Sequence, residues 1–120
     1  MDSFLVLLID DDPVLQDIVG AILNHHEIRL IVAHNEAETI AHLNEVRPDI
    51  ILLDILLPGT DGYALLKVIR ARVNCPVVAT TAYYASDSRV NIEAAGFDAF
   101  MPKPIIPQQL VFQLEKILHA

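Results

Sequence analysis

Several segments that resemble buried strands end in side chains that could do chemistry. Asp54 closes the apolar run 50–53, and Pro58-Gly59 breaks the chain shortly afterwards. An apolar run bounded in this way is typical of a buried strand that ends in a loop. Other runs are followed by Asp10 and Asp11 after residues 5–9, Thr81 after residues 77–79, and Lys103 after residues 100–101. Three carboxylates, a hydroxyl and an ammonium are groups that a metal-dependent phosphoryl site uses.

The elements that must position these side chains alternate between strand-like and helix-like patterns. Apolar or β-branched runs predict strands at residues 4–9, 28–33, 49–53, 77–81 and 98–101. Apolar residues at helical spacing predict a helix after each strand, with caps or first residues at Asp12-Pro13, Asn35, Asp61, either Ser86 or Asp87, and Pro107. We expect the second, third and fourth helices to end before Pro48, near Arg72 and at Gly96.

This alternation predicts an α/β fold, in which five helices cover both faces of a five-stranded parallel sheet. We expect the doubly wound, flavodoxin-like strand order 2-1-3-4-5, which places the first strand beside the third. The carboxyl ends of all the strands then lie along one edge, so the candidate residues can share a cleft despite their wide separation in the sequence. We expect residues 1–120 to form a single domain, because no linker or repeat divides them.

Carboxylates gathered at such an edge repel one another. Two unit charges about 4 Å apart repel by roughly 1 kcal/mol in water and by about 4 kcal/mol at an effective dielectric constant near 20. Mg²⁺ prefers oxygen ligands, relieves this repulsion and needs only one or two protein carboxylates. We expect Asp11 and Asp54 to bind Mg²⁺ directly, a backbone carbonyl near Leu56 to be a third ligand, and Asp10 to act through water.

A carboxylate beside a bound cation can attack phosphorus and form an acyl phosphate. We expect Asp54 to accept the phosphoryl group while Lys103 neutralises charge on the transferring oxygens. Thr81 would donate a hydrogen bond to the phosphoryl group and so sense its arrival. Thr80 is an alternative contact for the phosphoryl group. Alternation along the strand points the two hydroxyls to opposite faces of the sheet. The Ala82 that follows Thr81 favours Thr81 as the contact.

The motifs around these residues occur together in a known family. They are the segments 9–13, 57–59, 61–62 and 76–82, together with Asp54, Gly96 and Lys103-Pro104. On these motifs the chain resembles, over nearly its whole length, a bacterial two-component response-regulator receiver domain of the single-domain, chemotaxis-regulator type. The combination is specific, whereas any one of these motifs alone would be weak.

The resemblance implies a signalling switch rather than an enzyme that acts on a separate substrate. The domain would take phosphate from a phosphohistidine of a histidine kinase or histidine phosphotransfer protein, and it would catalyse its own dephosphorylation. Thr81 and Phe100 would then move inward and alter the face formed by the fourth helix, fifth strand and fifth helix, to which a downstream protein target binds. The resemblance also implies a cis peptide bond before Pro104, which would aim Lys103 into the cleft.

Two positions, Leu56 and Tyr83, depart from the family pattern. Leu56 and Tyr83 lie beside the route by which water attacks the phosphoryl group, and neither has an amide or carboxylate that could orient water. We therefore expect a long-lived phosphoryl group. Phe100 lacks a tyrosine hydroxyl, so we expect its switching to depend on packing.

Composition and charge exclude several other classes of protein. The net charge of −8 and the lack of a Lys/Arg cluster argue against direct binding to nucleic acid. The apolar run 4–9 is too short for membrane insertion and lacks the flanks of a signal peptide. The single Cys75 cannot form an internal disulfide, which suits the cytoplasm. We expect a monomer or weak dimer, and we interpret His25-His26 as surface residues rather than metal ligands.

Two other functions share parts of this pattern. A haloacid-dehalogenase-type phosphatase also forms an aspartyl phosphate, and Asp10 and Asp12 superficially fit its opening motif, but it needs a further acidic pair after the lysine. Glu115 is the only acid beyond Lys103. A flavodoxin-like electron carrier would need a loop rich in Ser, Thr and Gly after the first strand, where this chain has three acids.

Overall fold

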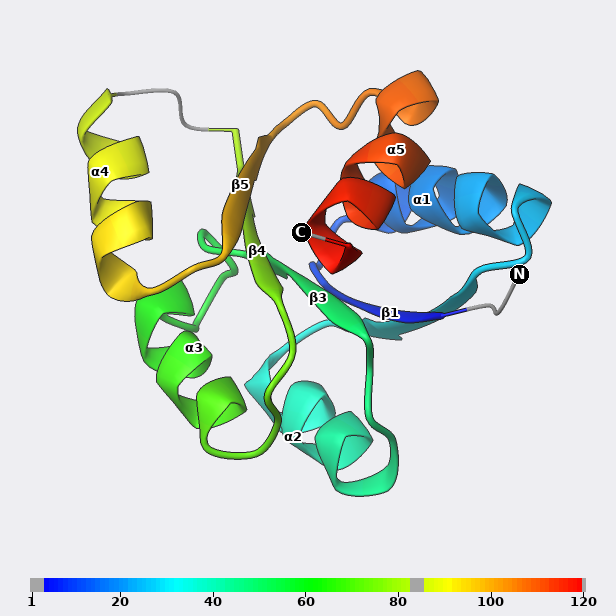
Figure 1. Cartoon of the computed structure of the whole chain (residues 1–120). Coiled ribbons are helices and arrows are strands. Elements are labelled where there is room, and N and C mark those ends of the chain that lie inside the picture. Colours follow the sequence, from blue (N-terminus) through cyan, green and yellow to red (C-terminus); the bar gives the residue numbers. More distant parts are fainter. Residues whose placement is uncertain (1–3, 83–85, 120) are drawn as a thin grey trace.

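The computed structural model describes residues 4–82 and 86–119. Its centre is a parallel sheet with the strand order β2-β1-β3-β4-β5 (Figure 1). The strands are β1 (Leu5–Ile9), β2 (Arg29–Ala33), β3 (Ile50–Asp54), β4 (Val77–Thr81) and β5 (Ala99–Pro102). The helices are α1 (Pro13–His25), α2 (Glu36–Glu45), α3 (Gly62–Arg70), α4 (Ser86–Ala95) and α5 (Pro107–Leu118). The predicted doubly wound order, with the first strand beside the third, is confirmed.

The sheet has a buried apolar core on each face. Leu7, Ile51 and Ala79 point toward α2, α3 and α4, where they pack with residues such as Leu65 and Ile92. The alternate residues of the same strands belong to a second core, which contains Leu8, Leu52, Val78, Val19 and Leu110. Helices α1 and α5 cover this face of the sheet (Figure 1). Because both faces are covered, β1 and β3 are apolar along almost their whole length rather than alternating with polar residues.

Polar side chains cap three helices where the sequence predicts them. The Asp12 carboxylate accepts a hydrogen bond from the backbone amide of Val14 at the start of α1. Asn35 caps α2 and Asp61 caps α3 through hydrogen bonds from the backbone amides of Glu38 and Tyr63. These contacts satisfy amides that have no partner within the helix, and they fix where each helix leaves the loop that follows a strand.

Two helix ends differ from the predictions. Helix α3 ends at Arg70 rather than near Arg72, because the amides of Arg72 and Val73 both donate to the carbonyl of Ile69, which tightens the chain into a turn. Ser86 is the first residue of α4, so the position that caps this helix lies outside the described residues. At its other end α4 stops at Ala95, and Gly96 adopts a φ of 100°, as the predicted terminator should.

Gly62 provides a test of the packing between the loop after β3 and helix α3. A methyl group at this position would lie 2.6 Å from the backbone Cα of Ile55, a contact that only a backbone shift can relieve. We expect Gly62→Ala to lower the free energy of unfolding by about 1–3 kcal/mol in chemical denaturation.

Gly20 is the matched control, because a methyl group there would meet only Leu30 Cδ2, at an ordinary 3.7 Å. Gly20 lies inside α1, where alanine is the better helix former, so Gly20→Ala should raise the free energy of unfolding by roughly 0.5–1 kcal/mol. Equal stabilities for the two variants would contradict this account of the loop.

Candidate functional site

Three carboxylates meet where β1 and β3 end. These strands are neighbours in register, with Ile9 opposite Leu53, so Asp10 and Asp54 follow at the same edge of the sheet. Asp10 is 0% exposed and Asp54 is 6% exposed, whereas Asp11 is open to solvent. One carboxylate oxygen from each of the three lies within 4.8 Å of the others. The spacing and the oxygen donors fit a divalent cation that prefers hard ligands.

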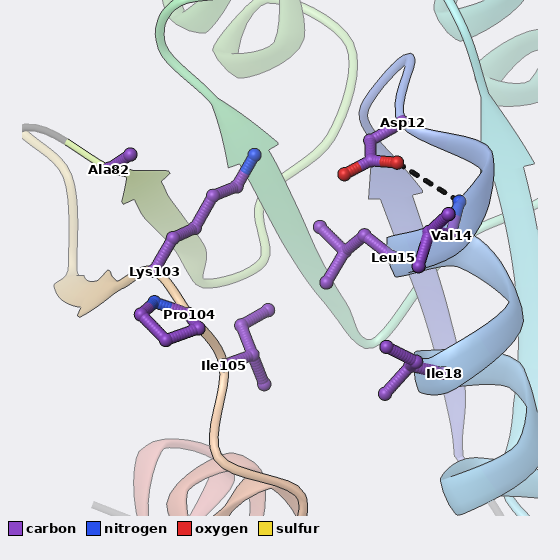
Figure 2. Close-up of a pocket in the computed structure, with 8 residues that line it drawn as sticks. All are labelled: Asp12, Val14, Leu15, Ile18, Ala82, Lys103, Pro104 and Ile105. Carbon is purple, nitrogen blue, oxygen red and sulfur yellow. Dashed lines mark hydrogen bonds between the residues drawn. The ribbon is translucent and has the colours of Figure 1, made fainter.

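Lys103 reaches this cluster from the segment that follows the edge strand β5. Its Nζ donates to Asp10 Oδ2 at 2.7 Å and to Asp54 Oδ2 at 3.3 Å. Its backbone amide donates to the carbonyl of Thr81, and the following peptide bond to Pro104 is cis, as predicted. Figure 2 shows the side chain extending from the segment after β5 toward the ends of the central strands. The structure therefore brings together Asp10, Asp54 and Lys103, three of the five residues that were expected to share a cleft.

The Lys103 ammonium is held in its charged form. Burial by itself would lower the pKa of this amine, but the hydrogen bond to Asp10 and the negative charges of Asp10 and Asp54 outweigh burial and raise the pKa. The site thus contains one fixed positive charge against three carboxylates. The remaining excess of negative charge is what a bound cation would neutralise.

Backbone and amide groups fix the orientation of the carboxylates. The amide of Leu56 donates to Asp54 Oδ1, and the amide of Asp12 donates to Asp10 Oδ1, both at 2.9 Å. The side-chain amide of Gln16, from the first turns of α1, donates to the backbone carbonyl of Asp10 at 2.8 Å. Sequence reasoning missed Gln16. The available signal was a polar residue in the first turns of the helix that directly follows the acidic triplet.

The two threonines at the end of β4 are both fully buried but belong to different faces. Thr80 is in register with Asp54, and by alternation it points to the face covered by α1 and α5. Thr81 points to the face of Ala79, toward α3 and α4. The two threonine side chains therefore point to opposite faces of the sheet, as predicted.

The other predicted switch residues are only partly within the described chain. Phe100 is partly buried and packs against the core on the face of α2, α3 and α4, which is also the face of Thr81. Leu56 is 62% exposed beside Asp54. The prediction for Tyr83 lies outside the described residues. Cys75 is no candidate nucleophile, since burial raises the pKa of its thiol to about 11.

A groove of about 470 Å³ adjoins the site. It lies between the first half of α1 and the segment 103–105 (Figure 2), and its walls are mostly apolar. Val14 and Ile18 on α1 are exposed there, while Lys103 and Asp12 are its charged residues. The groove therefore meets the site at Lys103. Within the described ranges, no helix is both long and apolar enough to cross a membrane.

Comparison with known sequences identifies one family. The family model described as the response regulator receiver domain matches residues 6–115. The transcriptional regulatory protein TrcR of Mycobacterium tuberculosis is 37% identical over 115 residues, which make up 95% of this chain and 45% of TrcR. The chain spans about half the length of the curated relatives that it matches.

Solved structures with the same fold include receiver domains. One belongs to a sensor histidine kinase of Pseudomonas aeruginosa and has a magnesium ion coordinated in its active-site cleft. It is 29% identical, with a TM-score of 0.86, over 99% of this chain and all of its own length. The BeF3-activated receiver domain of RstA from Klebsiella pneumoniae is 25% identical, with a TM-score of 0.87, over 97% of this chain and 99% of its own.

Proposed function

This chain belongs to the response regulator receiver domain family, and we propose that it is a signalling switch that accepts a phosphoryl group on Asp54. The observation that carries the proposal is the contact of Lys103 with both Asp10 and Asp54 at one edge of the sheet. A partly buried ammonium beside a nucleophilic carboxylate provides the charge neutralisation that phosphoryl transfer requires. We propose that residues 1–120 act as one receiver domain.

The donor set at the site fits Mg²⁺, because three carboxylates offer oxygen atoms within 4.8 Å of one another. We propose Asp11 and Asp54 as direct ligands, the backbone carbonyl of Leu56 as a third, and Asp10 as a partner through water. When bound, Mg²⁺ would neutralise negative charge on the carboxylates and on the phosphoryl oxygens. The magnesium in the related histidine kinase receiver domain supports this assignment.

In the proposed reaction, an oxygen of Asp54 attacks the phosphorus of a phosphohistidine. The new O–P bond forms as the N–P bond breaks, and the imidazole nitrogen leaves with the electron pair of that bond. Lys103 holds its positive charge over the oxygens that gain negative charge. Thr81 then donates a hydrogen bond to the phosphoryl group, and Phe100, on the same face of the sheet, repacks in response.

The partners follow from this chemistry. We propose that a histidine kinase or a histidine phosphotransfer protein supplies the phosphate, and that a downstream protein binds the face of α4, β5 and α5. The transfer makes the domain a phosphoacceptor that catalyses its own modification and hydrolysis, rather than an enzyme with a separate substrate. We place this function in the cytoplasm, in a domain that is a monomer or weak dimer and has no direct contact with nucleic acid. TrcR, a transcriptional regulatory protein, is about twice as long as the matched segment.

The first test is acceptance of phosphate. With Mg²⁺ and acetyl phosphate or phosphoramidate, intact-mass spectrometry should show one added phosphoryl group on the wild type. Asp54→Asn should abolish this addition, because an amide is too weak a nucleophile. Asp12→Asn is the control, since asparagine also caps a helix and this side chain only holds the amide of Val14. An Asp54→Asn protein that still gains the group would refute the assignment of Asp54.

The second test is the response to magnesium. Mg²⁺ at about 100 times its dissociation constant should stabilise the wild type by about 2.7 kcal/mol, seen as a rise in the melting temperature. Asp11→Asn should reduce this rise strongly, because it removes a proposed ligand that is exposed and plays no part in the core. Asp12→Asn should retain it. An undiminished rise in Asp11→Asn would show that the ion binds elsewhere.

The third test concerns the lifetime of the phosphoryl group. The backbone amide of Leu56 binds the Asp54 carboxylate, and the apolar Leu56 side chain cannot orient a water molecule. We expect the phosphoryl group to persist for minutes or longer after the donor is removed, and Leu56→Asn to shorten its half-life several-fold. Since Leu56 is 62% exposed, the substitution should change stability by less than about 0.5 kcal/mol. Complete hydrolysis within seconds in the wild type would contradict this expectation.

A further inference from the structure

The hydroxyl of Thr80 is buried without a partner. Thr80 is 0% exposed, and its Oγ1 has no hydrogen bond to any residue in the described part of the chain. A buried hydroxyl without a partner lowers stability, because it gives up its hydrogen bonds to water and gains nothing in return. Valine has nearly the same shape and would avoid this cost. Val78, two residues earlier on the same face, fills the core in that way.

Thr80 lies between the carboxylate and the strand that leads to the lysine. It is in register with Asp54 on β3 and with Met101 on β5. Leu52, Val78 and Met101 all belong to the core beneath α1 and α5, so Asp54 and Thr80 point to this same face at the end of their strands. The hydroxyl therefore lies at the floor of the site rather than in a remote part of the core.

The Lys103 side chain must pass over this floor. Lys103 follows β5, whereas its acceptors Asp54 and Asp10 lie at the carboxyl ends of β3 and β1. Strand β4, which carries Thr80, lies between β5 and β3 in the sheet. An ammonium has three N–H donors. Two of them are directed to Asp10 and Asp54, and the contact to Asp54 is the long one, at 3.3 Å against 2.7 Å. The ion pair as it stands favours Asp10 over the proposed phosphoacceptor.

We propose that the Thr80 hydroxyl positions the Lys103 ammonium over Asp54 during phosphoryl transfer. The negative charge of the incoming phosphoryl group would draw the ammonium from Asp10 toward Asp54. Thr80 Oγ1 then accepts the third N–H of Lys103 and so holds the ammonium on the Asp54 side of the site. Thr80 in this role touches Lys103 and not the phosphoryl group, so it is a positioning residue. The proposal rests on the phosphoacceptor function of Asp54.

The test compares Thr80→Val with Thr80→Ser, because serine keeps the hydroxyl and valine keeps the shape. The rate of phosphorylation by phosphoramidate is measured at saturating Mg²⁺. Loss of one hydrogen bond to a charged group predicts a rate roughly tenfold lower for Thr80→Val. Thr80→Ser should stay within about twofold of the wild type, since it retains the acceptor. Equal rates for Thr80→Val and wild type would overturn the proposal.

A double-mutant cycle separates positioning of the lysine from a general effect on the fold. In a Lys103→Met background, Thr80→Val should have no further effect on the rate, because the group through which it acts is absent. The same tenfold loss in that background would overturn the proposal. It would instead favour a direct contact of Thr80 with the phosphoryl group.

Thermal melting supplies the readout that does not depend on turnover. Without ions, Thr80→Val should melt at or above the wild-type temperature, because it removes an unsatisfied hydroxyl. With Mg²⁺ and beryllium fluoride, which imitates a phosphoryl group, its melting temperature should rise by less than that of the wild type. An equal rise, or a lower melting temperature without ions, would overturn the role of Thr80. A wild type that neither gains phosphate nor responds to these ions would instead overturn the proposed function itself.

Discussion

Two carboxylates with almost no access to water lie together at the end of this sheet, and the Lys103 ammonium donates a hydrogen bond to each of them. Asp10 and Asp54 would repel each other by several kcal/mol in surroundings of low effective dielectric constant. The ammonium bonds to both, and their charges keep it protonated despite its partial burial. With Asp11 included, however, one positive charge faces three negative ones. The site therefore attracts a further cation, because the single ammonium does not balance three carboxylates.

The order of the strands makes this contact possible. Asp10 and Lys103 are separated by 93 positions in the sequence, and they meet because β1, β3, β4 and β5 run parallel and end along one edge. Apolar cores on both faces hold the strands in register, so a change in one strand end is opposed by packing on two sides. The same order separates the two threonines of β4. Thr81 points to the face covered by α3 and α4, and Thr80 points to the face covered by α1 and α5.

Much of this arrangement could be predicted from the sequence, because it depends on patterns that the sequence displays directly. Apolar runs located the strands, and polar residues at their ends located Asp10, Asp54 and Lys103. The hydrogen bonds that orient the site could not be predicted in this way. The amide of Leu56, the side chain of Gln16 and the unpaired hydroxyl of Thr80 depend on distances of a few ångströms between atoms, and residue types carry no such information. The early end of α3 has the same origin, since it depends on which carbonyl the amide of Arg72 meets.

The unequal contacts of Lys103 suggest how cation and phosphate would be coupled in the proposed switch. The ammonium is closer to Asp10 than to Asp54, so Asp10 and the proposed phosphoacceptor compete for it. A cation at this cluster, held by Asp10 through water, would weaken the attraction of Asp10 for the ammonium and so favour contact of the ammonium with the phosphoryl oxygens. Coupling of this kind is reciprocal: if the cation favours the phosphorylated state, phosphorylation must tighten cation binding by the same factor. A divalent ion would then be part of the switch equilibrium itself, and not only an aid to the chemical step.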